Sequence, residues 1–187
     1  MAIAEIWQRI AAKIRTSAPA FTLPAGASEA DIVECETALG VSLPADYRES
    51  VAIHDGTKRF LFAHCELKPL TSVVSLWHLF EEVLQEPLAV PLSEWMRITG
   101  PIRLQRWSSR WIPIARTTSA DTFLLDLDPA PGGNPGQVIH MTHETSVLRL
   151  IAPSFEAWVG AFADALDADH YEARVYRGDL MELEERQ

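Results

Sequence analysis

Two aspartates in the second half of the chain are the residues best placed to do chemistry. Asp126 and Asp128 alternate with leucines in Leu-Asp-Leu-Asp-Pro, so on a strand both carboxyl groups would lie on one face, as paired-carboxylate catalysis requires. The stronger interpretation is a solvated sheet face. Leu125 and Leu127 then point into the core, and Asp128 caps the turn at Pro129. We therefore expect no acid–base pair at these positions.

Two histidines near these aspartates suggest a metal site. The candidate ligands are His140, His143 and Glu144, together with Asp126 and Asp128. Zinc needs three or four ligands that converge on one point. Residues three apart on a strand project to opposite faces, so His140 and His143 cannot bind one ion without a bulge. We expect neither a metal ion nor a cofactor.

The remaining catalytic motifs are also better explained by structure. Residues 131–136 form a glycine-rich loop, but a phosphate-binding loop precedes a helix and usually carries a lysine, whereas here a strand, 137–141, follows. A hairpin turn fits this loop. His54-Asp55 before Gly56 is interpreted as a helix end, and no serine has the Gly-x-Ser-x-Gly context of a nucleophile. The sequence therefore predicts a protein that is not an enzyme.

Trp107 and Trp111 are the residues best suited to protein binding. Four apart on one strand, they would lie on the same side, and Pro113 favours a kink nearby. Most tryptophans in a small domain belong to the core. One that is partly exposed beside Asp126 and Gln137 would be an aromatic anchor ringed by polar groups, as at a protein-binding hot spot. The candidate partner-binding residues are Trp107, Trp111, Asp126, Asp128, Gln137 and His54.

Composition predicts one acidic domain spanning residues 1–187. The chain is 48% apolar and carries a net charge of −10. A negative surface repels nucleic-acid phosphate and anionic lipid, so we expect no nucleic acid and no membrane as partner, and expect attraction to a basic protein. Charged residues interrupt the N-terminal apolar positions, which indicates a cytoplasmic protein without a signal peptide. Cys35 and Cys65 lie within apolar patterns and are expected to be buried free thiols.

The N-terminal 18 residues are expected to form an amphipathic helix. Its apolar residues repeat with helical spacing, which predicts one buried stripe. The stripe comprises Ile3, Ile6, Trp7, Ile10 and Ile14. A membrane-surface helix is the weaker alternative, because few cations lie opposite this stripe. A linker, 19–27, rich in Pro, Ala and Gly, follows.

Two short helices are expected next. Ser28 and Asp31 match a capping box, in which each side chain bonds the backbone of the other, and Gly40 is placed to end that helix in a left-handed conformation. The next helix begins near Pro44, whose fixed φ suits a first turn, and ends by Gly56. Together they form a helical pair before the first strand.

The middle of the chain gives a mixed signal. Residues 61–67 alternate as a strand does, and residues 72–86 repeat as a helix that Pro87 ends. Between 87 and 100 the only assignment is one helical turn at 93–96.

Four apolar, β-branched-rich runs in the second half indicate an antiparallel meander, because the turns between them are too short for crossover helices. The runs are 107–115, 121–129, 136–141 and 147–155. Ser154 then caps a final helix, and the last residues, 180–187, are expected to be frayed. The expected fold is α+β, with a mixed, mainly antiparallel sheet of about six strands and N- and C-terminal helices packed on it.

The order of these motifs resembles the SMI1/KNR4 family of the SUKH superfamily. The resemblance rests on Trp-x3-Trp-Ile-Pro-Ile-Ala, Leu-Asp-Leu-Asp-Pro-x-Pro-Gly-Gly, Gly-Gln-Val-Ile and Ser-Phe-x2-Trp, preceded by Leu-Pro-x2-Tyr and His-Asp-Gly. It covers roughly residues 28–166. The chain departs from the family at 117–120, where Thr-Thr-Ser-Ala stands in place of a glycine-rich turn.

The resemblance implies a protein that binds other proteins. Members of the family are known mainly as bacterial immunity proteins that neutralise toxin domains, and in fungi as regulators of cell-wall synthesis. The alanine-rich composition of this chain looks more like the bacterial form. The leading hypothesis is therefore a cytoplasmic immunity protein for a cognate toxin, such as a basic nuclease. The alternative is a regulatory or scaffold module of the cell-wall type.

Overall fold

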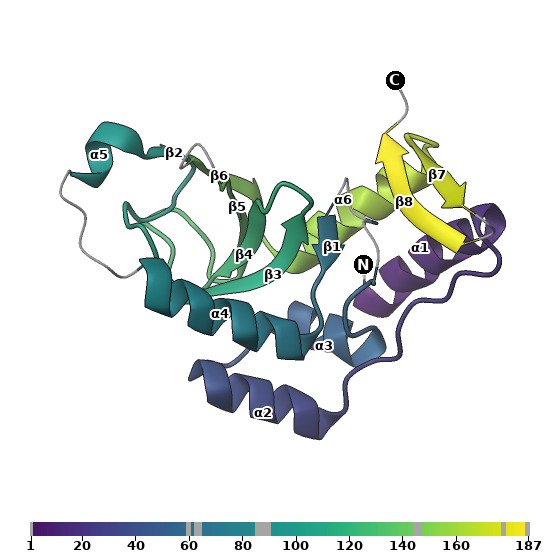
Figure 1. Ribbon diagram of the computed structural model, residues 1–187, viewed down its shortest axis with the longest axis horizontal. Helices are drawn as coiled ribbons and strands as arrows, with labels where there is room; N and C mark the ends of the chain where they lie inside the picture. The colour runs from purple at the N-terminus through teal and green to yellow at the C-terminus, as the bar shows by residue number, and fades with distance from the viewer. Residues whose placement is uncertain are drawn as a thin grey trace.

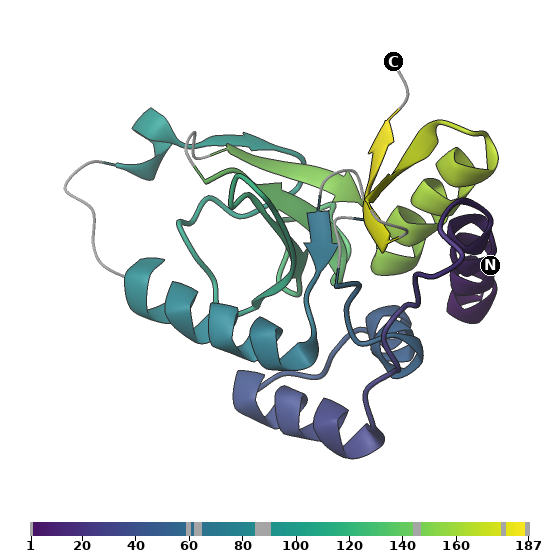
Figure 2. The same ribbon diagram turned by 45° about the vertical axis from the view of Figure 1, so that its right-hand side comes forward.

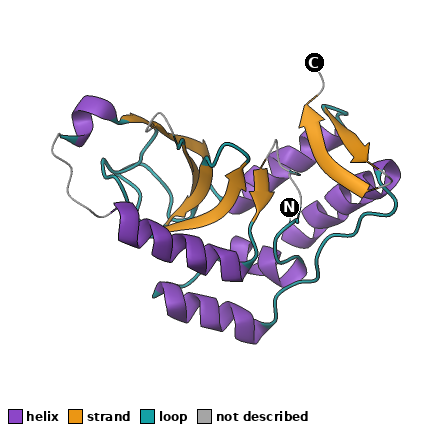
Figure 3. Cartoon of the chain, viewed as in Figure 1, coloured by secondary structure: helices purple, strands orange, loops and turns teal. Residues whose placement is uncertain are grey.

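The centre of the fold is a six-stranded mixed sheet (Figures 1 and 3). The computed structural model describes residues 2–58, 61, 65–84, 91–143, 147–176 and 179–185. The strands are β1 (Cys65–Leu67), β2 (Arg97–Thr99), β3 (Trp111–Thr117), β4 (Thr122–Asp126), β5 (Gln137–Met141) and β6 (Val147–Ala152). Their order is β1-β3-β4-β5-β6-β2, and only β2 and β6 run parallel. This arrangement confirms the expected α+β fold.

Helices cover the sheet unequally. They are α1 (Ile3–Ser17), α2 (Glu29–Leu39), α3 (Ala45–Ile53), α4 (Leu70–Leu84), α5 (Leu92–Trp95) and α6 (Phe155–Asp167). Helix α6 contacts β5 and β6, with α1 and α3 packed against it. Helix α4 contacts β3 and is backed by α2, and Figure 2 shows α4 and α5 at the end of the sheet away from α1.

The first three helices form as their sequences predict. The whole apolar stripe of α1 is buried. Ser28 and Asp31 make the reciprocal capping box of α2, and Gly40 ends it with a φ of 66°. Pro44 is the N-cap of α3 and lies just outside the helix. Arg9 of α1 bonds Asp164 of α6 at 2.6 Å, which helps hold the two helices together.

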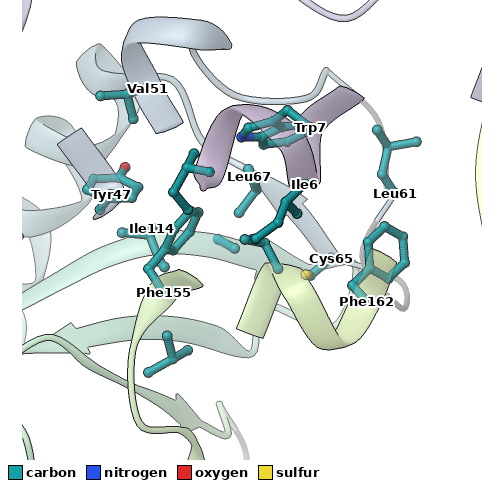
Figure 4. Packing of buried hydrophobic residues seen from close by; sticks show 14 of the residues in the cluster. Ile6, Trp7, Tyr47, Val51, Leu61, Cys65, Leu67, Ile114, Phe155 and Phe162 are labelled. Atoms are coloured by element: carbon teal, nitrogen blue, oxygen red, sulfur yellow. The ribbon is translucent and has the colours of Figure 1, made fainter. Parts of the chain in front are cut away.

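The larger hydrophobic core lies between the sheet, α1, α3 and α6 (Figure 4). Trp7 is fully buried, and its Nε1 donates to Ser50 Oγ at 2.9 Å, so the indole leaves no polar atom unsatisfied. Cys35 and Cys65 are buried free thiols, as expected. Burial raises the pKa of Cys35 to about 11 and also raises the pKa of Cys65, so both thiols are protonated at neutral pH.

A smaller core occupies the opposite face of the sheet. It consists of Met96, Ile102, Trp107, Trp111, Leu124, Ile139 and Leu148, and residues from α4 and α5 pack against it. We expected Trp107 on the strand with Trp111, but β3 begins only at Trp111. A turn over residues 108–111 precedes it, in which the Trp111 amide donates to Ser108 O at 2.9 Å. The register of β3 shifts between Pro113 and Ala115, which confirms the expected kink.

The region between residues 61 and 100 departs most from expectation. Within the expected strand 61–67, only β1 and the turn residue Leu61 lie in the described part of the chain. The expected helical turn is α5. The strand β2 was not predicted, because three residues are too few to show an alternating pattern, and its position depends on parallel pairing with β6.

Residues 180–185 belong to a strand, which corrects the prediction that residues 180–187 are frayed for the part that the structure describes. Strands β7 (Tyr171–Tyr176) and β8 (Asp179–Glu185) form an antiparallel hairpin outside the main sheet. Leu183 is 3% exposed and belongs to the larger core, and the ring of Tyr171 meets Phe162 edge to face at 5.3 Å. The burial of Leu183 and the packing of Tyr171 anchor this segment to the core, although its many charged residues favour exposure to solvent. Residues 186 and 187 lie outside the described part.

The turn between β3 and β4 is tight although it lacks glycine. The Ala120 amide donates to Thr117 O at 3.2 Å, and the Thr117 amide donates to Asp121 O at 2.9 Å. Ala120 has a φ of 69°, in the left-handed region that glycine occupies without strain.

We expect Leu183→Ala to lower the free energy of unfolding by about 2–4 kcal/mol, because it leaves a cavity where the hairpin meets the core. Urea titration measures the change. The control is Leu104→Ala, at a leucine that is 52% exposed, and it should change stability little. Equal effects of the two variants would contradict the anchoring of the hairpin.

Replacement of Ala120 by glycine should raise the free energy of unfolding by roughly 1 kcal/mol, because it removes left-handed strain from the turn. Ala12→Gly, on an exposed position of α1, should instead destabilise the chain by about the same amount. Thermal unfolding of the two variants compares them directly. Destabilisation by Ala120→Gly would contradict the left-handed geometry of the turn.

Candidate partner-binding site

A buried carboxylate lies at the junction of three strands. Asp126 ends β4 and is 0% exposed. Its Oδ1 accepts from Trp111 Nε1 of β3 at 3.1 Å and from the Asp128 amide at 3.1 Å, and its Oδ2 accepts from Gln137 Nε2 of β5 at 3.0 Å. Gln137 Nε2 also donates to Pro101 O at 3.1 Å. The carboxylate therefore joins β3, β4, β5 and the loop that precedes β3.

Burial and hydrogen bonding act on Asp126 in opposite directions. Burial penalises the charged form and raises the pKa of Asp126 above its ordinary value, while the donors from Asp128, Gln137 and Trp111 lower it. The net shift of this pKa is upward. The folded chain therefore holds the proton of Asp126 more tightly than the unfolded chain does.

These positions correct part of the predicted binding surface. Trp111, Asp126 and Gln137 are all buried, so they have no surface with which to contact a partner. The prediction failed because that face of the sheet is not solvated: Ile102, Trp107 and their neighbours cover it. Trp107 is 7% exposed and its Nε1 donates to Glu81 Oε1 at 2.8 Å, so it too serves the core.

The other two predicted binding residues reach the surface. Asp128 is half exposed and pairs with Arg103 at 3.0 Å. His54 is half buried: its Nδ1 lies 2.6 Å from Pro24 O, and its ring meets Trp7 edge to face at 5.0 Å. The structure places His54 among the N-terminal helices and Asp128 beside the sheet, so it does not bring the six predicted residues together in one exposed site.

The structure also shows where the glycine-rich loop and the candidate metal ligands lie. Residues 131–136 form the turn between β4 and β5, as expected, and a Cβ on Gly133 would lie 2.8 Å from Gln137 Oε1 and 2.9 Å from Pro101 O. His140 Nε2 is 3.6 Å from Asp121 Oδ2. Glu144 lies outside the described residues, and among those described no three His, Cys, Asp or Glu side chains are grouped as a metal site requires.

An apolar groove opens between α4, α5 and the sheet. Its volume is about 440 Å³. The apolar side chains that line it include Leu79, Phe80, Val83, Leu84, Trp95 and Leu148. Arg106 and Arg116 also line the groove. Leu79 and Val83, four residues apart on one side of α4, are 47% and 49% exposed.

A second hollow continues from this groove toward the start of α4. It is also about 440 Å³ and shares Arg116 and Ala120 with the first. Apart from Leu76, its other lining is polar and consists of Lys68 and four hydroxyl side chains. Together the two hollows form a strip along α4, which we call the α4 groove, that is apolar at one end and polar at the other.

The sequence carried a signal for this groove that we did not use. The helix was predicted from the spacing of Val73, Trp77, Phe80 and Leu84 alone, yet α4 has further apolar residues on other sides, namely Val74, Leu76, Leu79 and Val83. A helix apolar over so wide an arc is either buried on several sides or presents an apolar face outward. Here Leu79 and Val83 face outward.

Comparison with known proteins defines the class of the chain. Residues 26–161 match the model of the SMI1/KNR4 family (SUKH-1), and the chain belongs to this family. The match contains β1 to β6 and all helices except α1, apart from the end of α6. Among the described residues, no helix is long and apolar enough to cross a membrane.

Three relatives from fungi show similarity over most of this chain. The cell wall biosynthesis/cell cycle regulator smi1 of Schizosaccharomyces pombe is 26% identical over 74% of the chain, and a glucan synthesis regulatory protein of Neurospora crassa is 23% identical over 90%. The KNR4/SMI1 homolog of Yarrowia lipolytica is 22% identical over 78%. The matches span 30%, 39% and 28% of these relatives' own lengths.

Replacement of Asp126 by asparagine should lower the free energy of unfolding by roughly 1–3 kcal/mol at pH 7, because the new NH2 group would face Gln137 Nε2, donor to donor. Rotating the Gln137 amide does not help, since its oxygen would then face Pro101 O. Denaturant titration measures the loss. The control, Asp128→Asn, breaks an exposed pair and should cost about 0.5 kcal/mol.

The penalty of Asp126→Asn should also depend on pH. Because the pKa of Asp126 is raised in the folded chain, its stabilising contribution is full below the unfolded pKa and is lost as pH rises through the folded pKa. The difference in unfolding free energy between wild type and Asp126→Asn should therefore be largest in acid and shrink toward pH 7. If this difference in unfolding free energy instead grew from acid to pH 7, the pKa of Asp126 would be lowered in the folded chain.

Proposed function

We propose that this chain is a non-enzymatic protein-binding module with a regulatory or scaffold role. Membership of the SMI1/KNR4 family carries this proposal, because two of its fungal relatives are named as regulators of cell-wall or glucan synthesis. These names favour the regulatory hypothesis over the toxin-immunity hypothesis. Since fold alone does not define function, the proposal also needs support from the described side chains.

The described side chains support binding more than catalysis. Asp126, the buried carboxylate with a raised pKa, uses its oxygens to join strands, is 0% exposed and lies under a packed apolar cluster. Both thiols are buried and protonated at neutral pH, so neither supplies a thiolate nucleophile. The α4 groove is an open concave surface, and it is lined by apolar side chains at one end and by hydroxyl groups and cations at the other.

Toxin immunity is the second candidate function, and the charge of the chain favours it. A net charge of −10 accelerates association with a basic protein by electrostatic steering. In this case one tight partner would bind with a rate that falls steeply as salt is added. A regulatory module would instead bind several partners with weaker affinity.

Affinity purification from the organism that encodes the chain tests the proposal. The tagged protein should retain several host proteins in amounts below one per chain, identified by mass spectrometry at low and moderate salt. A variant with Trp7 replaced by alanine, which disrupts the larger core, controls for partners that bind unfolded protein.

The outcome separates the candidates. Several partners retained only by the folded chain support the regulatory proposal. A single stoichiometric partner that is toxic when produced alone would replace it with the immunity function. Retention of no protein in either salt condition would overturn the protein-binding proposal.

A further inference from the structure

We infer that the α4 groove binds a short extended segment of a partner protein, one that places a carboxylate beside apolar side chains. This inference rests on the proposed protein-binding function and names the site and the chemistry of its ligand. Exposed Leu79 and Val83 give the groove its apolar end, and Arg116 lies where the apolar and polar hollows meet.

The apolar end has the geometry of a peptide-binding surface. Leu79 and Val83 are each about half exposed, and their exposed surface adjoins Trp95 and Leu148 in one hollow. Covering such side chains contributes about 25 cal/mol for each Å² removed from water. Grooves of this kind bind peptides by admitting a few anchor side chains.

The charge of the groove is opposite to that of the whole chain. The protein has 26 acidic and 16 basic residues, yet the described lining of the two hollows contains Lys68, Arg106 and Arg116 and no carboxylate. Lys68 already pairs with Glu66 at 2.6 Å, so Arg116, at the meeting point of the hollows, is the cation on which the inference rests. An acidic ligand therefore meets Arg116 within the groove, while the net negative charge of the chain repels it elsewhere. This local complementarity favours an acidic segment over a basic one.

Arg116 supplies an unsatisfied donor at the meeting point of the two hollows. Its Nη2 donates to Ala120 O at 3.3 Å, while its Nε is buried and has no hydrogen-bond partner among the described residues. Trp95 Nε1, in the apolar hollow, is also buried without such a partner. A ligand carboxylate can satisfy a guanidinium through two parallel hydrogen bonds once the Arg116 side chain turns toward it.

The length of the groove sets the length of the ligand. Its lining on α4 runs from Ser72 to Leu84, which is about 18 Å of helix. An extended chain covers this distance with about five or six residues. The expected ligand therefore has apolar residues at one end and an aspartate or glutamate near its middle, opposite Arg116.

Selection from a random library of 12-residue peptides displayed on phage tests this inference. Enriched peptides are synthesised with a fluorescent label, and their affinity is measured by anisotropy on the full chain. Val83→Ser and Arg116→Gln should each weaken binding about tenfold, the effect of losing one anchor or one charged hydrogen bond.

Two matched variants serve as controls. Val33→Ser changes a valine of α2 that is 48% exposed, nearly the same as Val83, and Arg149→Gln removes an exposed arginine of β6 outside the groove. Both should change affinity less than about twofold. Circular dichroism confirms that each variant is folded, and Val83→Ser alters a largely solvated position, so it keeps the test valid if Arg116→Gln fails to fold.

Enrichment of acidic, apolar peptides that are weakened only by the groove variants supports the inference. No enrichment, selection of basic peptides, or equal effects of the groove and control variants would overturn it. If Val83→Ser and Arg116→Gln leave the binding of a host partner unchanged, the groove is not the binding site. The proposed protein-binding function would still stand. Failure of the proposed function itself would appear as retention of no host protein.

Discussion

The fold depends on a charge that it buries. Asp126 sits inside the sheet because Trp111, Gln137 and the Asp128 amide each bring a donor to it. Removing a carboxylate from water is costly, and the group persists there only while these hydrogen bonds hold. Through Gln137 the network also fixes the loop at Pro101 and the turn before β5, where the Asn134 amide donates to Gln137 Oε1. One buried polar network thus sets the register of three strands and positions the segments that cover them.

This network explains why the binding surface lies elsewhere. Polar side chains that a sheet face usually presents to solvent are here used in joining strands, and Trp107 and Ile102 close over them. The open part of that face lies farther along the strands, where Thr122, Met141 and Leu148 meet α4 and α5. The proposed protein-binding role rests on the fungal relatives named as regulators and on this groove.

Periodicity in the sequence was enough to predict most elements, but not which sheet face is covered. The stripe of α1, the capping box at Ser28 and the meander were correct because each depends on local spacing. The alternation of strand residues correctly placed Asp126 and Leu125 on opposite faces of the sheet. It did not reveal that residues 96–107 pack over the face that carries Asp126. Strand β2 depends on its distant partner β6, and β8 on burial of Leu183, so local pattern showed neither.

Hydrogen–deuterium exchange on the chain, free and bound to a host protein it retains, tests most directly whether the rigid sheet presents α4 to a partner. We predict that binding slows exchange in peptides covering residues 70–84 and 116–122 and leaves α2 and the β7–β8 hairpin unchanged. Slower exchange confined to α1, α3 and α6, with residues 70–84 unaffected, would contradict the account.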